Sequence, residues 1–164
     1  MKDHALRDCR RAISAVNTPG NEEEVKRIGK DYFGGNLSMT DRNRRALVQT
    51  IALVSDKLEH APIECATCQD EHCNNDAVAF VDDARTKILL CPQFFNPLLV
   101  KPFMAPRALI HEAAHLANLD RNASIREEFY CHQGATKDEK CPVIDPLHNV
   151  DAWSYFIQEL AYTI

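Results

Sequence analysis

The sequence lacks several features that mark particular classes of protein. No apolar run approaches the roughly 20 residues that a helix needs to cross a bilayer, so we expect no membrane span. No block of Lys and Arg stands out and the formal net charge is -5, which argues against nucleic acid as the main partner. Internal repeats and long linkers are also absent. The 164 residues are therefore expected to form a single domain, 1–164, that is a monomer.

The beginning of the sequence also lacks the pattern of a secretory signal peptide. A polar segment of helical character follows Met1, where a signal peptide would have an apolar stretch. The chain is then either cytosolic when it is synthesised, or a mature or excised domain with an added Met1. Seven cysteines are many for a cytosolic protein of this size, and they favour an oxidising destination. We expect a secreted or otherwise exported protein, as a mature domain or a delivered effector.

The cysteines are expected to form a disulfide framework. Three predicted pairs leave Cys68 as a free thiol: Cys73–Cys91, Cys131–Cys141 and Cys9–Cys65. The first pair would clamp two expected strands, which its cysteines flank, and the second would close a short loop. The alternative is a zinc site built on Cys65, Cys68 and Cys73, but the chain offers no second matching half for it.

The first 60 residues contain three helical patterns. Apolar residues recur at helical spacing in 5–16, and the Thr-Pro-Gly sequence at 18–20 ends that pattern. Asn21 is expected to cap a second helix with an acidic first turn, and Thr40 is expected to cap a third, longer helix. We interpret these helices as scaffold.

The pattern then changes to that of a small sheet. Residues 77–81 and 86–90 have the composition of two antiparallel strands, and the polar residues between them predict a hairpin. Helical spacing returns from about Pro106, and again from Asp145, where Pro146 follows an N-cap residue. The expected fold class is α+β and predominantly helical. It has three parts: a helical scaffold in 1–60, a small antiparallel sheet in 65–95, and further helices in 105–164.

The residues that carry chemistry begin with the HExxH sequence at 111–115. His111 and His115 are four residues apart and share one helix face, so both imidazoles can bind one zinc ion. Glu112, one residue round the helix, can take a proton from a metal-bound water. The alternative is an ordinary helix with two surface histidines. Because apolar residues already supply a buried side, we interpret the histidine face as a site for one Zn²⁺ per chain.

A catalytic zinc needs a third protein ligand. The extension HExxHxxGxxH is absent, because Asn118 and Arg121 stand where its glycine and third histidine would be. Acidic and histidine side chains further along are the candidates: Asp120, Glu127, Glu128, His132, His148, Asp151 and Glu159. Asp120 would require an immediate chain reversal without a glycine. Spacing alone does not choose among the others.

This stretch resembles the aspzincin metallopeptidases, the family that contains deuterolysin and the peptidyl-Lys metalloendopeptidases. In that family a short loop after HExxH leads to Asp-x-x-Tyr, whose Asp is the third zinc ligand and whose Tyr assists the transition state. Glu127-Glu128-Phe129-Tyr130 matches it as Glu-x-x-Tyr. The resemblance implies a zincin-like fold, Glu127 as the third ligand and Tyr130 as a catalytic residue. Glu128 is the alternative ligand, because glutamate is one methylene longer than the family's aspartate.

The resemblance covers most of the chain. Three further segments match family elements: 9–13, 90–95 and 149–156. Segment 149–156 matches the family's Asn-Ala-Asp element, with Asp151 at the position of its Asp. The resemblance implies that Asp151 orients a zinc histidine or meets a basic side chain of the substrate. The alternative is a polar residue near a helix start. Lysine-specific members bind the substrate lysine with a Glu three residues later. Ser154 stands there instead, so Asp151 and Ser154 are expected to contact substrate without carrying a lysine preference.

Together these residues predict a zinc endopeptidase that acts on a protein or peptide substrate. Glu112 would take the proton of the attacking water and pass it to the leaving amine, and Tyr130 would donate to the oxyanion. The substrate is expected to pair along an exposed strand edge within 77–91. The alternatives are a delivered toxin or effector metallohydrolase that acts on a cell-wall peptide amide, and a non-catalytic interaction module.

Overall fold

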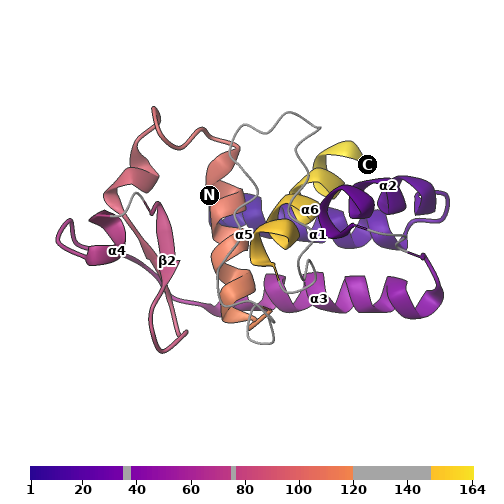
Figure 1. Ribbon diagram of the computed structural model, residues 1–164, viewed down its shortest axis with the longest axis horizontal. Helices are drawn as coiled ribbons and strands as arrows, with labels where there is room; N and C mark the ends of the chain where they lie inside the picture. The colour runs from indigo at the N-terminus through magenta and orange to yellow at the C-terminus, as the bar shows by residue number, and fades with distance from the viewer. Residues whose placement is uncertain (35–37, 75–76, 120–148) are drawn as a thin grey trace.

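The computed structural model describes residues 1–34, 38–74, 77–119 and 149–164. In chain order its described elements are α1 (Lys2–Asn17), α2 (Glu22–Phe33), α3 (Asp41–His60), β1 (Ile63–Cys65), α4 (Glu71–Asn74), β2 (Ala79–Val81), β3 (Ile88–Leu90), the 3-10 helix η1 (Pro92–Phe95), α5 (Met104–Leu116) and α6 (Val150–Thr163). Figure 1 shows α4 and the sheet at one end, α1, α2, α3 and α6 at the other, and α5 between them. The predicted α+β class, predominantly helical, is confirmed.

Apolar stripes hold the helical end together. The helix α1 packs against α3 and α6, and α3 also packs against α5. The buried side chains recur at helical spacing: Ala5, Cys9, Ala12 and Val16 in α1, and Leu47, Ile51, Val54 and Leu58 in α3. Burying one side chain of the size of Leu or Ile contributes roughly 1.5–3 kcal/mol. The sequence periodicity therefore located the scaffold helices correctly.

The two expected helix caps differ in outcome. The Oγ1 atom of Thr40 accepts a hydrogen bond from the backbone N–H of Asn43 at 3.3 Å, which confirms Thr40 as the cap of α3. Asn21 stands before α2, but its side chain makes no capping bond. It donates instead to the backbone carbonyl of Ala15 at 3.2 Å. The predicted N-cap position of Asn21 is confirmed, but its side chain makes no capping bond because its amide ties the α1–α2 turn back to α1.

The sheet contains the predicted hairpin and one strand that was not predicted. β2 and β3 pair antiparallel, and β1 pairs with β3 in parallel, so the strand order is β1-β3-β2. The sheet is therefore mixed: the predicted antiparallel hairpin is confirmed, and β1 adds a parallel strand to it. β1 has only three residues and its partner lies beyond the intervening hairpin strand, so no local pattern marked it.

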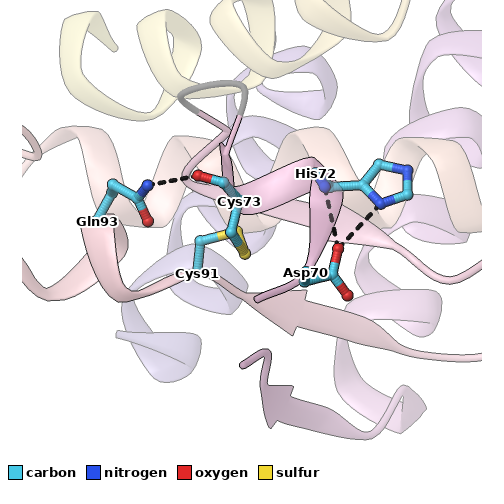
Figure 2. Close-up of a disulfide and its surroundings, with 5 residues drawn as sticks. All are labelled: Asp70, His72, Cys73, Cys91 and Gln93. Atoms are coloured by element: carbon cyan, nitrogen blue, oxygen red, sulfur yellow. Dashed lines mark hydrogen bonds and ion pairs between the residues drawn. A yellow bond between two sulfur atoms is a disulfide. The ribbon is translucent and has the colours of Figure 1, made fainter. Parts of the chain in front are cut away.

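A disulfide joins α4 to the end of β3, as predicted. Cys73 and Cys91 are bonded, with their Cα atoms 5.4 Å apart. Figure 2 shows this bond beside Gln93, whose side-chain amide donates to the backbone carbonyl of Cys73 at 2.6 Å. Closing a loop of this length contributes about 3 kcal/mol in the chain-entropy model. The disulfide fixes the irregular segment around α4 against the sheet.

The other predicted cysteine pairs have different outcomes. Cys9 is a free, buried thiol in α1, while Cys65, at the end of β1, and Cys68 are free and exposed. The predicted Cys9–Cys65 disulfide is therefore wrong, because the helical spacing of Cys9 places it in the apolar core. The pair Cys131–Cys141 lies outside the described residues.

The helix α6 begins with a local cap. Asn149 precedes Val150, and its side-chain oxygen accepts from the backbone N–H groups of Asp151 at 2.9 Å and Ala152 at 3.3 Å. The expected start at Asp145 lies outside the described residues. Within the described ranges, no helix has both the length and the hydropathy that a membrane span requires.

Candidate metal and catalytic site

The helix α5 carries the HExxH sequence and is buried along most of its length. Leu109, Ile110 and Ala113 are at most 2% exposed, so the core fixes the position of the helix. His111 is 9% and Glu112 is 7% exposed. Both polar side chains are therefore held in a largely water-excluded environment, where electrostatic interactions are stronger than in water.

The two histidine rings converge at one pair of atoms. The Nε2 atoms of His111 and His115 lie 3.2 Å apart, and their ring centroids are 5.0 Å apart. Two nitrogens that bind one tetrahedral zinc ion at about 2.0–2.1 Å are roughly 3.3 Å from each other. The spacing of the two donors therefore fits a shared zinc ion.

The other ring nitrogen of His111 faces an acid of α6. Its Nδ1 atom lies 3.3 Å from Oδ1 of Asp151, and both residues are buried. A carboxylate accepts hydrogen bonds, so the tautomer that satisfies this contact has its proton on Nδ1 and leaves the lone pair of Nε2 for a metal. Ser154 is fully buried beside them, and its hydroxyl donates to the backbone carbonyl of Asp151 at 2.8 Å. An acid that holds a metal-binding imidazole in this way fixes both its tautomer and its orientation.

The hairpin supports the other end of the motif. Arg85, in the turn before β3, donates from Nη1 to the backbone carbonyl of His115 at 2.9 Å. The carboxylate of Asp82 shapes this turn, because it accepts from the hydroxyl of Thr86 at 2.7 Å and from the backbone N–H groups of Thr86 and Lys87. These bonds lower the pKa of Asp82, with the Thr86 side chain as the largest cause. The sequence predicted the turn but not its contact with α5.

Comparison with known proteins identifies the family. The family model of the aspzincins, described as lysine-specific metallo-endopeptidase, matches residues 19–158. The chain belongs to the aspzincin family. A search of the curated proteins finds no match.

A solved structure shows the same fold as this aspzincin chain. The zinc peptidase from Grifola frondosa superposes with a TM-score of 0.55, over 96% of this chain and 94% of that chain. The two sequences are 15% identical, so the comparison supports the fold alone. The predicted resemblance and fold class are both confirmed.

Within the described residues, no third metal ligand accompanies His111 and His115. The described residues contain no group of three His, Cys, Asp or Glu side chains that could hold a metal ion. Most candidates lie outside the described residues: Asp120, Glu127, Glu128, His132 and His148, together with Tyr130. Glu159 is described and lies elsewhere, because its carboxylate accepts from the Tyr32 hydroxyl at 2.5 Å and contacts Arg27 at 3.2 Å. Its candidacy is therefore wrong.

The alternative cysteine zinc site is also wrong. Cys73 is bonded to Cys91, so it cannot bind a metal as a thiolate. Cys65 and Cys68 remain as free thiols.

One contact beside the histidines was missed by sequence reasoning. The guanidinium carbon of Arg107 lies 4.0 Å from the ring centroid of Tyr155. Arg107 stands four residues before His111, and Tyr155 four residues after Asp151, so each lies on the same helix face as the site residue. Burial raises the pKa of Tyr155 and the charge of Arg107 opposes that shift. The i,i+4 spacing was the available signal for both residues.

Proposed function

We propose that this aspzincin is a zinc-dependent endopeptidase. The observation that carries the proposal is that the Nε2 atoms of His111 and His115 lie 3.2 Å apart. Asp151 contacts the other nitrogen of His111, Nδ1, and the chain belongs to a family of metallo-endopeptidases. His111 and His115 would hold the metal with one further ligand. The resemblance of the Glu-x-x-Tyr element to the family's Asp-x-x-Tyr supports Glu127 as that ligand, with Glu128 as the alternative.

The bound zinc would supply a Lewis acid that lowers the pKa of a water and polarises the scissile carbonyl. Glu112 follows His111 directly on α5 and is 7% exposed, so its carboxylate lies in a setting where it can accept the water's proton. It would then deliver that proton to the leaving amine. Tyr130 would donate a hydrogen bond to the oxyanion of the tetrahedral state.

We propose a positioning role for the α6 pair. Asp151 contacts His111 and is 7% exposed, so it acts by holding the imidazole more than by meeting a substrate side chain. Ser154 is 0% exposed and its hydroxyl is bonded to Asp151. Its contribution is to support the start of α6, in place of the substrate contact expected from the family's Glu at this position.

An extended peptide would bind at the free edge of β2. Among the described strands β3 is the central one, so an additional strand can pair with β1 or β2. β2 also packs against α5, the helix that carries both histidines. Main-chain pairing gives general affinity for peptides, and pockets for alternate side chains give specificity. The Cys73–Cys91 disulfide supports action outside the reducing cytosol, in a secreted or delivered form.

Digestion of two substrates tests this function. Purified protein with its metal content measured is incubated with casein and, separately, with purified peptidoglycan. A zinc endopeptidase cleaves casein, loses that activity to a chelator and regains it with added Zn²⁺. Release of peptidoglycan fragments without casein cleavage would instead support the cell-wall amide hydrolase. A metal-loaded protein that cleaves neither substrate would contradict both.

A further inference from the structure

The helices α5 and α6 run antiparallel beside the site and contact each other at successive turns. His111 faces Asp151 at 3.3 Å, and Arg107 faces Tyr155 at 4.0 Å. In both helices the second residue is four positions from the first, so the two contacts are one helical turn, about 5.4 Å, apart. Arg107 therefore stands directly beside the catalytic site on the helix that carries it.

The guanidinium of Arg107 has no acidic partner in the described part of the chain. No described carboxylate lies within 4.0 Å of it, and its contact is the face of the Tyr155 ring. The two acids of α6 are engaged elsewhere, Asp151 with His111 and Glu159 with Tyr32 and Arg27. A guanidinium stacked on an aromatic ring keeps its N–H edges available for a planar, bidentate carboxylate.

A hollow lined partly by Tyr155 lies beside this contact, along α6. Its volume is about 270 Å³, and Phe103, Tyr155 and Glu159 are among the side chains that line it. The amide of Gln158 donates to the backbone carbonyl of Phe103 at 2.8 Å, which holds the start of α5 against α6. Because Phe103 stands two turns before His111, the surface between the histidines and this hollow includes Arg107.

We propose that Arg107 is a specificity-determining residue that binds an acidic side chain of the substrate, Asp or Glu, within two residues of the cleaved bond. The inference rests on the proposed peptidase function. Successive residues of an extended peptide are about 3.3 Å apart. The helical turn of α5 that separates Arg107 from His111, about 5.4 Å, therefore spans one or two residues of the substrate. The charge of Arg107 repels a substrate lysine, and Ser154 supplies no compensating acid. This chain thus departs from the lysine preference in the description of its family.

Peptide binding to an inactive variant tests the proposal without requiring turnover. The zinc-loaded Glu112→Gln protein is titrated into fluorescently labelled, otherwise neutral peptides that carry one Glu or one Lys at successive positions. Fluorescence anisotropy is expected to show roughly 10- to 100-fold tighter binding of the best Glu peptide than of its Lys counterpart, as for a charged hydrogen bond. Adding Arg107→Glu to the same background should abolish or reverse this preference. Arg107→Gln, which keeps most of the side-chain length, should abolish it.

The matched control is Arg45→Glu in the same background. Arg45 is exposed in α3, away from the proposed site. Its substitution makes the same change of charge as Arg107→Glu and should leave the preference for Glu peptides intact. Equal binding of Glu and Lys peptides would overturn the proposal, as would a Glu preference that persists in folded Arg107→Gln protein. Failure of the peptidase function looks different, because wild type would then cleave neither peptide while the Glu preference and its dependence on Arg107 remain.

Discussion

Nδ1 of His111 lies 3.3 Å from Oδ1 of Asp151, so the closing helix α6 holds a histidine of the HExxH sequence on α5. The contact joins residues 40 positions apart and is buried. The other nitrogen of the His111 ring, Nε2, lies 3.2 Å from Nε2 of His115. A single interaction between two helices thus sets the direction of one proposed metal donor.

Asp151→Ala is expected to weaken zinc binding by roughly 10- to 100-fold, because the imidazole of His111 loses the group that fixes its orientation. Asp151→Asn should cost less, since an amide oxygen can still accept from Nδ1. Competition with a chromophoric chelator measures the affinity. Asp83→Ala, which removes an exposed acid of the hairpin turn, serves as the control and should change the affinity little. An unchanged affinity in folded Asp151→Ala protein would show that this contact does not position the metal donor.

The proposed third ligand predicts an order of effects among three neighbouring residues. Glu127→Ala should lose most of the zinc, because two imidazoles remain. Glu128→Ala should keep both metal and activity. Tyr130→Phe should keep the metal and lower the rate by roughly 10- to 1,000-fold, if its hydroxyl is an oxyanion donor. Metal analysis and casein cleavage distinguish the three, and loss of zinc in Glu128→Ala alone would move the ligand by one residue.

Arg85→Asn is expected to lower the free energy of unfolding by about 1–3 kcal/mol, because the carbonyl of His115 loses a charged donor. Arg85 has a φ of 53°, and asparagine tolerates this conformation, so the turn itself should be kept. Urea unfolding measures the difference. Asp83→Asn in the same turn is exposed and should have little effect. Equal stability of the two variants would remove the proposed link between hairpin and helix.

The free thiols should differ sharply in reactivity. Cys9 is buried, and burial raises its pKa to about 12, so little thiolate forms at pH 8. Cys65 and Cys68 are exposed. Native protein treated with iodoacetamide should therefore be labelled at Cys65 and Cys68, and at Cys9 only after unfolding. Peptide mass spectrometry identifies the labelled sites, and rapid native labelling of Cys9 would contradict its burial.

Features that depend on local spacing could be predicted from the sequence. The helical period placed α1 and α3, and alternation with a polar turn placed the β2–β3 hairpin. Flanking cysteines then predicted the Cys73–Cys91 disulfide. Each of these patterns lies within about 20 residues, where the geometry of one element or one turn limits the possible partners.

Features that depend on packing between distant elements could not be predicted. The pairing of β1 with β3 follows from how the sheet assembles, and the contact of Arg107 with Tyr155 follows from how α5 and α6 meet. Asn21 shows the same effect at short range, since a carbonyl of the preceding helix competes for its side chain. The position of Asp151 beside His111 was expected from the family resemblance, not from spacing.

Replacement of Glu112 by Gln tests the central proposal most directly, because it removes the proposed proton acceptor and keeps the shape of the side chain. Zinc content by elemental analysis and casein cleavage are measured on the same preparation. We predict close to one zinc per chain in both proteins and a rate at least 100-fold lower in Glu112→Gln. A folded, zinc-loaded Glu112→Gln protein that cleaves casein at the wild-type rate would contradict the account.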